Sequence, residues 1–382
     1  MTQLKIGIIG AGGGVGSSRG ASFARVLQAL GEDAKVTGIC DIQREHADRG
    51  ASEVGARAFY DYGEMLDSGL DAVVIATPLP FHAEQAVQAL DKGVNVLSEV
   101  TACHDMDSAE RLARAAAKSS AVYMLAENYR YFDEVELIKR MAEDGRFGEL
   151  YNAEGEYLHD CRDLFRYPDG SLTWRGQGWP GTYCTHSLGP LLYILDDRLV
   201  RVMALDTGMP PRWDPGVGFP ESTTFLGKTT RGAVVKVRVD YQSRRPHIMA
   251  SYQLQGTAGC YESMRGLGDE AKVWLSDVHE PSRCWAPRGE PIAQWHPMAE
   301  FQERYIPERL AVGKEARLGG HGTSEYWLLK EFFAAVRGER ESPIDVYRAL
   351  DYTVPGICAV ISAESGGRAV EVPDFRRLVQ AG

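Results

Sequence analysis

A glycine cluster near the N-terminus constrains the fold of this chain more strongly than any other feature. Residues 5–9 form an apolar run typical of a short buried strand, and residues 10–16 follow at once with the sequence Gly-Ala-Gly-Gly-Gly-Val-Gly. Residues 21–30 then show the apolar spacing of a helix. This order favours a dinucleotide site, because glycines let the backbone approach a pyrophosphate closely. The glycines fit two registers of the motif, so the motif alone leaves an ordinary tight turn as an alternative.

Length and composition limit what the chain can be. At 382 residues it is long enough for two domains. The formal net charge is -11 and no basic run occurs, which argues against nucleic acid, whose phosphates require a positive surface. No stretch approaches the roughly 18 consecutive apolar residues of a membrane helix, and the first strand leaves no space for a secretory signal. We therefore expect a cytoplasmic protein that binds neither nucleic acid nor a membrane.

The cysteines and histidines show no metal-binding pattern. The seven cysteines are scattered, odd in number and never spaced as Cys-x-x-Cys. Free thiols in a reducing compartment explain them best. No set of His, Cys and carboxylate residues has the spacing of a metal site, so we expect no metal.

Strand and helix patterns alternate over the first third of the chain. Strands are expected at residues 5–9, 35–40, 71–77, 94–99 and 122–127, with helices at 21–30, at 82–92 and ending at 117. This alternation is typical of parallel βαβ units. We predict a doubly wound parallel sheet, a Rossmann fold, in an NAD-binding domain over residues 1–127.

Beyond residue 127 the pattern changes. After one amphipathic helix at 134–143, strand-like segments dominate at 151–159, 200–206, 223–228, 233–241, 248–255, 259–264 and 271–276. Their alternating polarity is typical of antiparallel strands, and helices are expected at 186–195, 324–337 and 347–364. We predict an α+β domain over residues 128–382 with a large, mostly antiparallel sheet and helices on one side. Residues 162–181 form a loop of a length that is usually functional.

Residues at the ends of the first strands are candidates for cofactor binding. Asp41 ends the second predicted strand, where a carboxylate accepts hydrogen bonds from an adenosine ribose and disfavours a 2′-phosphate. NAD is therefore expected rather than NADP, although Arg44 nearby leaves NADP open. From the loop and the strand ends we predict cofactor contacts by Gly10, Gly12, Gly13, Gly14, Val15, Asp41, Thr77 and Pro78.

The same positions resemble a known family. The glycine-rich turn, Asp41, the segment Ala76-Thr77-Pro78 with His82, Glu99 and the pair Glu127-Asn128 together resemble the Gfo/Idh/MocA oxidoreductases. The resemblance covers nearly the whole chain. It implies a Rossmann domain followed by an open-faced sheet domain that carries the substrate residues and commonly mediates oligomerisation. A homodimer or homotetramer through that open face is therefore expected. The resemblance also adds His82, Glu99 and Glu127 to the cofactor contacts.

Two positions depart from the ordinary dehydrogenases of that family. Those enzymes carry Glu-Lys-Pro after the fifth strand, whereas this chain has Glu99-Val100-Thr101 and lacks the lysine. They also carry an aspartate four residues before the catalytic histidine, where this chain has Thr182 ahead of His186. Two of the usual three catalytic groups are absent, which puts an ordinary alcohol dehydrogenase mechanism in doubt.

Both departures resemble the NAD-dependent glycosidase branch of the family, such as glycoside hydrolase family 109. The matching segments are Glu99-Val100, Glu127-Asn128, residues 156–162 and 183–190, and His321-Gly322. The chain is shorter than is usual for family 109, so a sister family, such as the NAD-dependent sulfoquinovosidases, fits equally well.

That resemblance implies a redox route to glycoside hydrolysis. Bound NAD+ oxidises the C3 hydroxyl of the sugar, which acidifies the C2 proton. The aglycone is then eliminated, water adds at C1 and the hydride returns. His and Tyr suit the proton transfers near neutral pH, so we predict His186 and Tyr183 as catalytic residues, without assigning either to C2 or C3. Glu99, Asn128, His159, Asp160 and His321 are predicted to bind or orient the substrate.

These residues also have structural alternatives. His186 could cap the helix that it opens, and Tyr183 could be a packing residue with a satisfied hydroxyl. Glu99 could be an interdomain ion-pair partner, and residues 321–322 could be a simple loop.

Arginine and tryptophan are concentrated at residues 162–179, in an otherwise acidic protein. Aromatic rings suit a sugar face, and arginines suit a carboxylate, phosphate or sulfonate. Arg162, Arg166, Trp174 and Arg175 are therefore predicted to bind an anionic glycoside, such as a sulfosugar glycoside. Solvated arginines on a surface loop are the alternative.

The sequence thus favours an NAD-dependent glycoside hydrolase. A sugar or polyol dehydrogenase with His186 alone as base is one alternative, and a non-catalytic NAD-binding sensor is another. A hydride that is borrowed and returned within one turnover lets NAD stay bound. We therefore expect NAD to co-purify with the protein.

Overall fold

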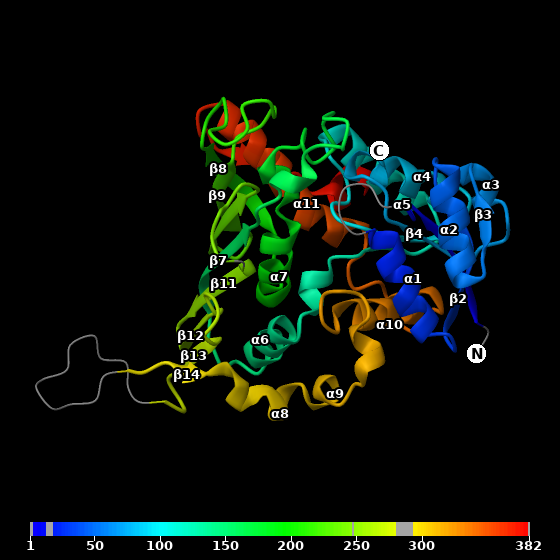
Figure 1. Cartoon of the computed structure of the whole chain (residues 1–382). Helices are drawn as coiled ribbons and strands as arrows, with labels where there is room; N and C mark the ends of the chain where they lie inside the picture. The colour runs from blue at the N-terminus through cyan, green and yellow to red at the C-terminus, as the bar shows by residue number, and fades with distance from the viewer. Residues whose placement is uncertain (1–2, 13–17, 247, 280–292, 381–382) are drawn as a thin grey trace, which may run out of the picture.

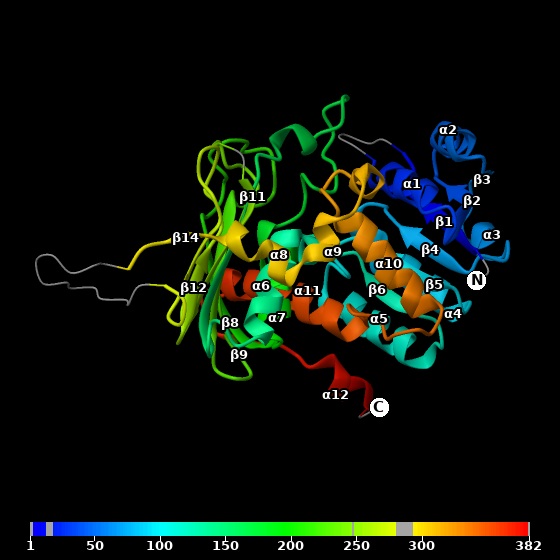
Figure 2. The same ribbon diagram turned by 90° about the horizontal axis from the view of Figure 1, so that it is seen from below.

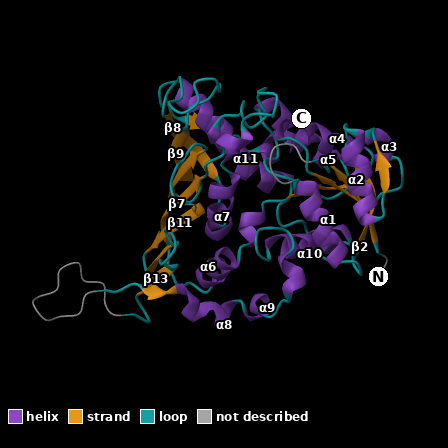
Figure 3. Ribbon diagram, viewed as in Figure 1, coloured by secondary structure: helices purple, strands orange, loops and turns teal. Residues whose placement is uncertain are grey.

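The chain forms two sheets with helices packed between them (Figure 1). The computed structural model describes residues 3–12, 18–246, 248–279 and 293–380. The first sheet has six strands and the second has nine. Figure 3 shows the two sheets as separate layers, with helices filling the space between them.

The first sheet is parallel throughout its described pairings. Its strand order is β3-β2-β1-β4-β5-β6, which confirms the predicted doubly wound Rossmann fold. The strands are β1 (Leu4–Ile9), β2 (Ala34–Cys40), β3 (Arg57–Phe59), β4 (Ala72–Ile75), β5 (Asn95–Ser98) and β6 (Tyr123–Leu125). The helices are α1 (Arg19–Ala29), α2 (Arg44–Val54), α3 (Tyr62–Leu66), α4 (His82–Asp91) and α5 (Met106–Lys118). The sequence analysis missed β3, α2 and α3, because β3 has only three residues and α2 is mostly polar.

The turn after β1 requires glycine at its first position. Gly10 has a φ of +92°, and a Cβ there would lie 2.6 Å from the backbone carbonyl carbon of Ala76. Since L side chains disfavour this conformation and the neighbour is backbone, no larger residue fits without a shift. On the far side of the loop, Ser18 caps α1 by accepting a hydrogen bond from the backbone N–H of Ala21.

The second sheet is antiparallel except for one pair of strands. Its order is β14-β13-β12-β11-β7-β10-β9-β8-β15, and only β10 and β7 run parallel among the described pairs. The strands are β7 (Leu150–Leu158), β8 (Leu199–Asp206), β9 (Ser222–Thr229), β10 (Val234–Asp240), β11 (Ile248–Gly256), β12 (Gly259–Glu262), β13 (Lys272–Leu275), β14 (His296–Pro297) and β15 (Val370–Glu371). All seven predicted strands are present, so the predicted mostly antiparallel sheet is confirmed.

Helices cover one face of this large sheet and connect it to the first sheet (Figure 2). α7 packs on β7, β10 and β11, and α11 packs on β8 and β9 while also contacting α5 and β6. The α-helices of this part are α6 (Asp133–Glu143), α7 (Thr185–Leu195), α8 (Gln302–Tyr305), α9 (Pro307–Leu310), α10 (Ser324–Val336), α11 (Val346–Glu364) and α12 (Phe375–Gln380). The short 3-10 helices of the chain are η1 (Leu79–Phe81), η2 (Asn128–Tyr131), η3 (Arg162–Leu164), η4 (Pro180–Tyr183), η5 (Met298–Phe301) and η6 (Lys314–Arg317).

The other face of the large sheet carries exposed apolar side chains. Met203 and Leu205 on β8 and Leu226 on β9 are each at least half exposed. The predicted division of the chain at residue 127 stays a prediction, because α11 packs against both sheets. Among the described helices none is long and apolar enough to cross a membrane.

Candidate active site

A pocket of about 390 Å³ lies where the first sheet faces the helices of the second. Its floor comes from segments just beyond the carboxyl ends of β1, β4, β5 and β6, the edge at which open parallel sheets bind ligands. The lining residues are Gly12, Ser18, Arg19, Ala76, Pro78, Glu99, Asn128, Tyr129, Tyr157, His159, Leu164, Tyr167, Thr173, Trp174, Arg175, Tyr183, His186, Met249 and His321.

The nucleotide end of this pocket fits a dinucleotide. The N–H of Gly12 and the N–H of Gln43 donate to the two carboxylate oxygens of Asp41, at 2.8 and 2.9 Å. These bonds hold Asp41 at the tip of β2 directly beside the glycine loop. Gly20 is also required, since a Cβ there would lie 2.5 Å from the carbonyl oxygen of Gly10. The predicted contacts Gly13, Gly14 and Val15 lie outside the described residues.

The predicted cofactor residues Thr77 and His82 support the pocket floor from below. The hydroxyl of Thr77 donates to the side-chain carbonyl of Gln85 at 2.6 Å. The ring of His82 is buried, and its two nitrogens contact the backbone carbonyls of Thr77 at 2.7 Å and Thr101 at 2.9 Å. His82 is thus not a lining residue of the pocket, whereas Pro78 is. This packing fixes Pro78 beside the expected nicotinamide position.

His186 forms a buried pair with Glu127. Its Nδ1 lies 2.7 Å from Oε1 of Glu127, and the same oxygen accepts the backbone N–H of Tyr129 at 3.1 Å. Glu127 is fully buried, and when Nδ1–H of His186 donates to it, Nε2 of the neutral ring is left able to accept a proton. The ring of Tyr129 stacks on His186 with centroids 4.0 Å apart. Cys184 is the N-cap residue of α7 and no side-chain hydrogen bond caps this helix, so His186 is not its cap.

Tyr183 lies edge-on to His186, with ring centroids 5.3 Å apart. Burial raises the pKa of its phenol, while the nearby guanidinium of Arg175 acts in the opposite direction. That guanidinium lies 4.8 Å from the Tyr183 ring centre and 4.5 Å from that of Trp174. One of its terminal nitrogens is buried and has no hydrogen-bond partner among the described residues. The charge of Arg175 therefore acts directly on the phenol of Tyr183, beside His186.

The arginines of the long loop differ in their surroundings. Arg162 donates to Asp160 through Nε at 2.6 Å, and Arg166 pairs with Asp214 at 3.1 Å. Asp160, Arg162 and Arg166 are absent from the pocket lining, and their contact with substrate stays a prediction. Arg162 and Arg166 each already have a carboxylate partner. Of the three predicted arginines, only Arg175 lines the pocket.

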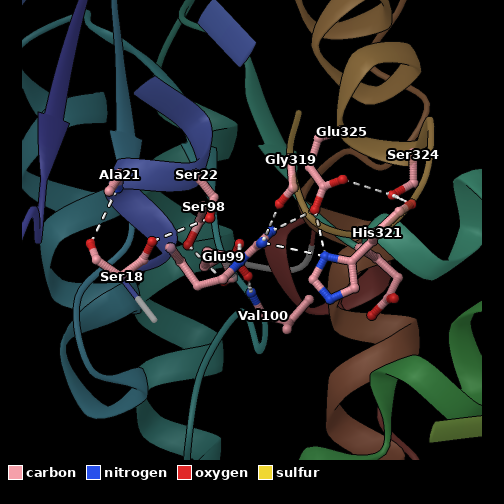
Figure 4. Close-up of polar contacts among 12 residues, drawn as sticks. Ser18, Ala21, Ser22, Ser98, Glu99, Val100, Gly319, His321, Ser324 and Glu325 are labelled. Carbon is pink, nitrogen blue, oxygen red and sulfur yellow. Dashed lines mark hydrogen bonds and ion pairs between the residues drawn. The ribbon is translucent and has the colours of Figure 1, made fainter. Parts of the chain in front are cut away.

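Glu99 belongs to a charged cluster that joins α1 to α10 (Figure 4). Nε of Arg19 donates to Glu99 at 2.8 Å, and its Nη2 donates to Glu325 at 3.1 Å. Nδ1 of His321 lies 2.6 Å from the same Glu325 oxygen. Burial acts to raise the pKa of Glu325, but the bond from His321 and the charge of Arg19 lower it to about 2.

This cluster fixes the position of Glu99 in the pocket. Its second oxygen accepts the backbone N–H of Val100 at 3.3 Å. Glu99 is thus an ion-pair partner, as the structural alternative proposed, and it also lines the pocket. His321 lies in the bend before α10, where Glu325 holds its ring.

Most predicted substrate residues converge on the pocket, together with some that sequence reasoning missed. The predicted residues in the lining are Glu99, Asn128, His159, Trp174, Arg175, Tyr183, His186 and His321. The missed residues include Arg19, Tyr129 and Tyr157. Arg19 opens the helix after the glycine loop and Tyr129 directly follows Asn128, so proximity to those motifs was the available signal. Tyr157 lies in the matching segment 156–162, two residues before His159, so it carried the same signal.

One group of potential metal ligands lies elsewhere, near the β13–β14 edge of the large sheet. It comprises His279, His296 and Glu300. The two imidazole rings stack face to face, with centroids 3.8 Å apart and planes 3° apart. Parallel stacked rings cannot both direct a nitrogen lone pair at one ion in their own planes, so this packing does not favour a metal centre.

Comparison with known proteins relates both parts of the chain to described families. Residues 4–127 match a family model described as oxidoreductase family, NAD-binding Rossmann fold. Residues 221–379 match one described as glycosyl hydrolase 109, C-terminal domain. A glycosyl hydrolase family 109 protein of Saccharopolyspora erythraea is 28% identical, over 98% of this chain and 83% of its own.

Two more distant relatives differ in their activities. An alpha-N-acetylgalactosaminidase of Shewanella oneidensis is 24% identical, over 99% of this chain and 86% of its own. A solved levoglucosan dehydrogenase, in complex with NADH and L-sorbose, has a TM-score of 0.79 at 20% identity. The likeness covers 98% of this chain and 100% of that one, and at this identity it establishes the fold alone.

Proposed function

Because the chain joins an NAD-binding domain of the Gfo/Idh/MocA oxidoreductase family to a glycosyl hydrolase 109 C-terminal domain, we propose that it is an NAD-dependent glycosidase. The observation that carries the proposal is the His186–Glu127 pair beside Tyr183, at the carboxyl edge of a Rossmann sheet. This position supports the proposal, because a Rossmann sheet presents the reactive ring of a dinucleotide at its carboxyl edge. Bound NAD supplies a hydride acceptor and donor there.

His186 acts as the general base and acid. Its Nδ1 is held by Glu127, so Nε2 accepts a proton from the substrate, and the buried carboxylate stabilises the imidazolium that forms. The stacked ring of Tyr129 keeps the imidazole from rotating. Glu127 therefore serves as a positioning residue for His186.

Tyr183 is the second proton-transfer group. Burial keeps its phenol protonated at neutral pH, so it donates first. When it gives up its proton, the Arg175 guanidinium stabilises the phenolate. Two groups of different basicity on one side of the pocket suit a reaction that removes a proton from one sugar carbon and returns one elsewhere.

Glu99 binds sugar hydroxyls. Its carboxylate is fixed by Arg19 and by the Val100 N–H, and an ionised carboxylate accepts strong hydrogen bonds from hydroxyl groups. Trp174 and Tyr157 line the same pocket and offer apolar rings to the faces of a sugar. The pocket therefore combines one hydroxyl acceptor with aromatic walls.

The preferred substrate is an anionic glycoside. Arg175 has no carboxylate partner among the described residues, and one of its nitrogens is buried without a hydrogen bond. A sulfonate or carboxylate on the sugar satisfies both the charge and the open donor. A sulfosugar glycoside fits this requirement.

One assay separates this proposal from its alternatives. The protein is incubated with 4-nitrophenyl α-N-acetylgalactosaminide, with 4-nitrophenyl α-sulfoquinovoside and with the corresponding free sugars. Nitrophenol release and NADH absorbance are followed together. A glycosidase releases nitrophenol without net NADH, and solvent deuterium enters the sugar at C2. Steady NADH formation from a free sugar instead identifies a sugar dehydrogenase, and neither signal from protein that holds NAD identifies a sensor.

The proposal extends to cofactor retention and assembly. A hydride returned in each turnover gives no reason for NAD to leave, so the protein co-purifies with NAD. Met203 and Leu226 are cross-strand neighbours on the open face of the large sheet, and with Leu205 they form an apolar strip that suits a second copy of the chain. A homodimer or homotetramer is checked by light scattering, with Leu205→Glu as the disrupting variant. Cytoplasmic location stays a prediction.

A further inference from the structure

A second hollow, of about 470 Å³, adjoins the catalytic pocket. It lies between the start of α6, strand β11, residues 263–264 and residues 321–323. Met249 and His321 line both spaces. The ring of Tyr129 lines the catalytic pocket, stacked on His186 and 5.9 Å from the His321 ring. The hollow is therefore a continuation of the site that begins at His186.

The walls of this hollow are largely apolar. Phe132, Tyr252 and Met264 supply rings and a thioether. The hollow has two carboxyl groups, those of Asp133 and Glu134. Oδ1 of Asp133 already accepts hydrogen bonds from Arg309 at 3.2 Å and from Thr323 at 2.9 Å. Such walls accept an uncharged group with an apolar face and resist an anion.

Glu134 is the second carboxyl group of the hollow. One of its oxygens accepts the Ser263 hydroxyl at 2.9 Å, and the other has no hydrogen bond within the described chain. Burial raises the pKa of Glu134, which brings its carboxyl closer to the neutral form. A free carboxyl oxygen in an apolar hollow suits a hydroxyl group on the ligand.

A glycoside needs space for two parts, the sugar and the aglycone. Gly12, Ala76 and Pro78 occupy the nucleotide end of the catalytic pocket, and the loop residues Leu164, Thr173 and Trp174 line another side. The second hollow continues the pocket past Met249 and His321. We infer that this hollow binds the aglycone of the substrate, and that the preferred aglycone is an uncharged alcohol with an apolar face. The inference rests on the proposed glycosidase function.

Bulky substitutions in the hollow test the inference. Ala250→Trp fills the hollow from β11, and Met264→Trp fills it from a half-exposed position where folding is not at risk. For the glycoside that the wild-type holoenzyme hydrolyses, KM is measured for the 4-nitrophenyl and the methyl form. We expect the ratio of the two KM values, aryl over methyl, to rise at least tenfold in both variants. Leu310→Trp, at a half-exposed position outside the hollow, is the matched control and leaves the ratio unchanged.

The possible outcomes are distinct. An unchanged KM ratio in an active Met264→Trp enzyme overturns the inference while leaving the glycosidase proposal intact. A tenfold rise caused by Leu164→Trp instead places the aglycone on the loop side and also overturns it. A Met264→Trp variant whose molar mass falls while its KM ratio stays constant assigns the hollow to a second copy of the chain, against the inference. A wild-type enzyme that hydrolyses no glycoside defeats the proposed function itself, and this inference with it.

Discussion

The two ends of the catalytic pocket are built from different parts of the polypeptide. At the nucleotide end, backbone atoms make the fit: Gly10 and Gly20 pack against neighbouring carbonyls, and the N–H of Gly12 fixes Asp41. At the sugar end, side chains form the binding surface: Tyr157 from β7, Tyr183 from η4 and His186 from α7. An added methyl group should therefore damage the first end, whereas removal of functional groups should damage the second.

The largest expected effect is at the sugar end. His186→Ala removes the imidazole that is paired with Glu127, and we expect kcat to fall by about 10³-fold. The NAD content of the purified variant should be unchanged, because the glycine loop is untouched. Turnover of the 4-nitrophenyl glycoside and the absorbance of bound nucleotide are the two measurements.

His104→Ala is the matched control, since that histidine is exposed and lies outside the pocket. Loss of bound NAD in His186→Ala would show that the two ends are not independent and would contradict the comparison.

The next largest effect is expected at the nucleotide end. Gly10→Ala places a Cβ 2.6 Å from the Ala76 carbonyl at a φ of +92°, so the loop must move. We expect NAD to bind about 100-fold more weakly, or ~2.7 kcal/mol, while kcat at saturating NAD changes little. Isothermal titration calorimetry with NAD measures the affinity.

Gly69→Ala isolates the contribution of the clash. Gly69 has a similar φ of +83° but no atom within 4 Å of the added Cβ. The unfolding free energy of Gly69→Ala should fall by about 1–2 kcal/mol, the cost of placing an L side chain at a positive φ. Its NAD affinity should not change. Equal NAD affinities for the two variants would remove the steric argument.

The sequence predicted the nucleotide end better than the sugar end. The glycine loop, the strand that precedes it and Asp41 are close in sequence, so their spacing alone indicated their arrangement. The parallel sheet followed from the strand–helix alternation, although β3 is too short to leave a pattern.

The partners of the side chains at the sugar end could not be predicted. Glu127 was assigned to the cofactor, but the fold brings it against His186, 59 residues later in the chain. Arg162, Arg166 and Arg175 lie in the same arginine-rich loop and could not be distinguished by sequence. They differ in the fold, where Asp160 pairs with Arg162 and Asp214 pairs with Arg166. Long-range pairing of this kind depends on the tertiary fold and leaves no local pattern.

The charged cluster at the seam between α1 and α10 should contribute a pH-dependent stability. The pKa of Glu325 is lowered from 4.5 to about 2, so its stabilisation is complete above pH 4.5 and is lost as the pH falls from 4.5 to 2. We expect Glu325→Gln to lower the unfolding free energy at pH 7 by on the order of 2 kcal/mol. Denaturant unfolding at several pH values measures the difference, which should shrink below pH 4.5.

Glu308→Gln serves as the control for this prediction. Glu308 pairs with Arg140 but is nearly half exposed, so its loss should cost at most about 1 kcal/mol. A wild-type advantage over Glu325→Gln that stays constant from pH 7 to pH 3 would mean that the carboxylate charge is not what stabilises the seam.

The smallest expected effect concerns the recognition of a charged substrate at the sugar end. Arg175→Gln removes a loop arginine that lines the pocket. Its buried nitrogen without a hydrogen-bond partner among the described residues is the donor assigned to an anionic sugar. We expect kcat/KM for 4-nitrophenyl α-sulfoquinovoside, divided by that for the neutral glucoside, to fall about tenfold, or ~1.4 kcal/mol. Arg166→Gln, which breaks an ion pair outside the pocket, should leave this ratio unchanged.

If Arg175 acts only on Tyr183, both substrates are hydrolysed more slowly to the same extent. The basic limb of the pH profile then moves to higher pH, because the phenolate has lost its cation. The ratio therefore separates substrate recognition from activation of Tyr183, two roles that the position of one guanidinium combines.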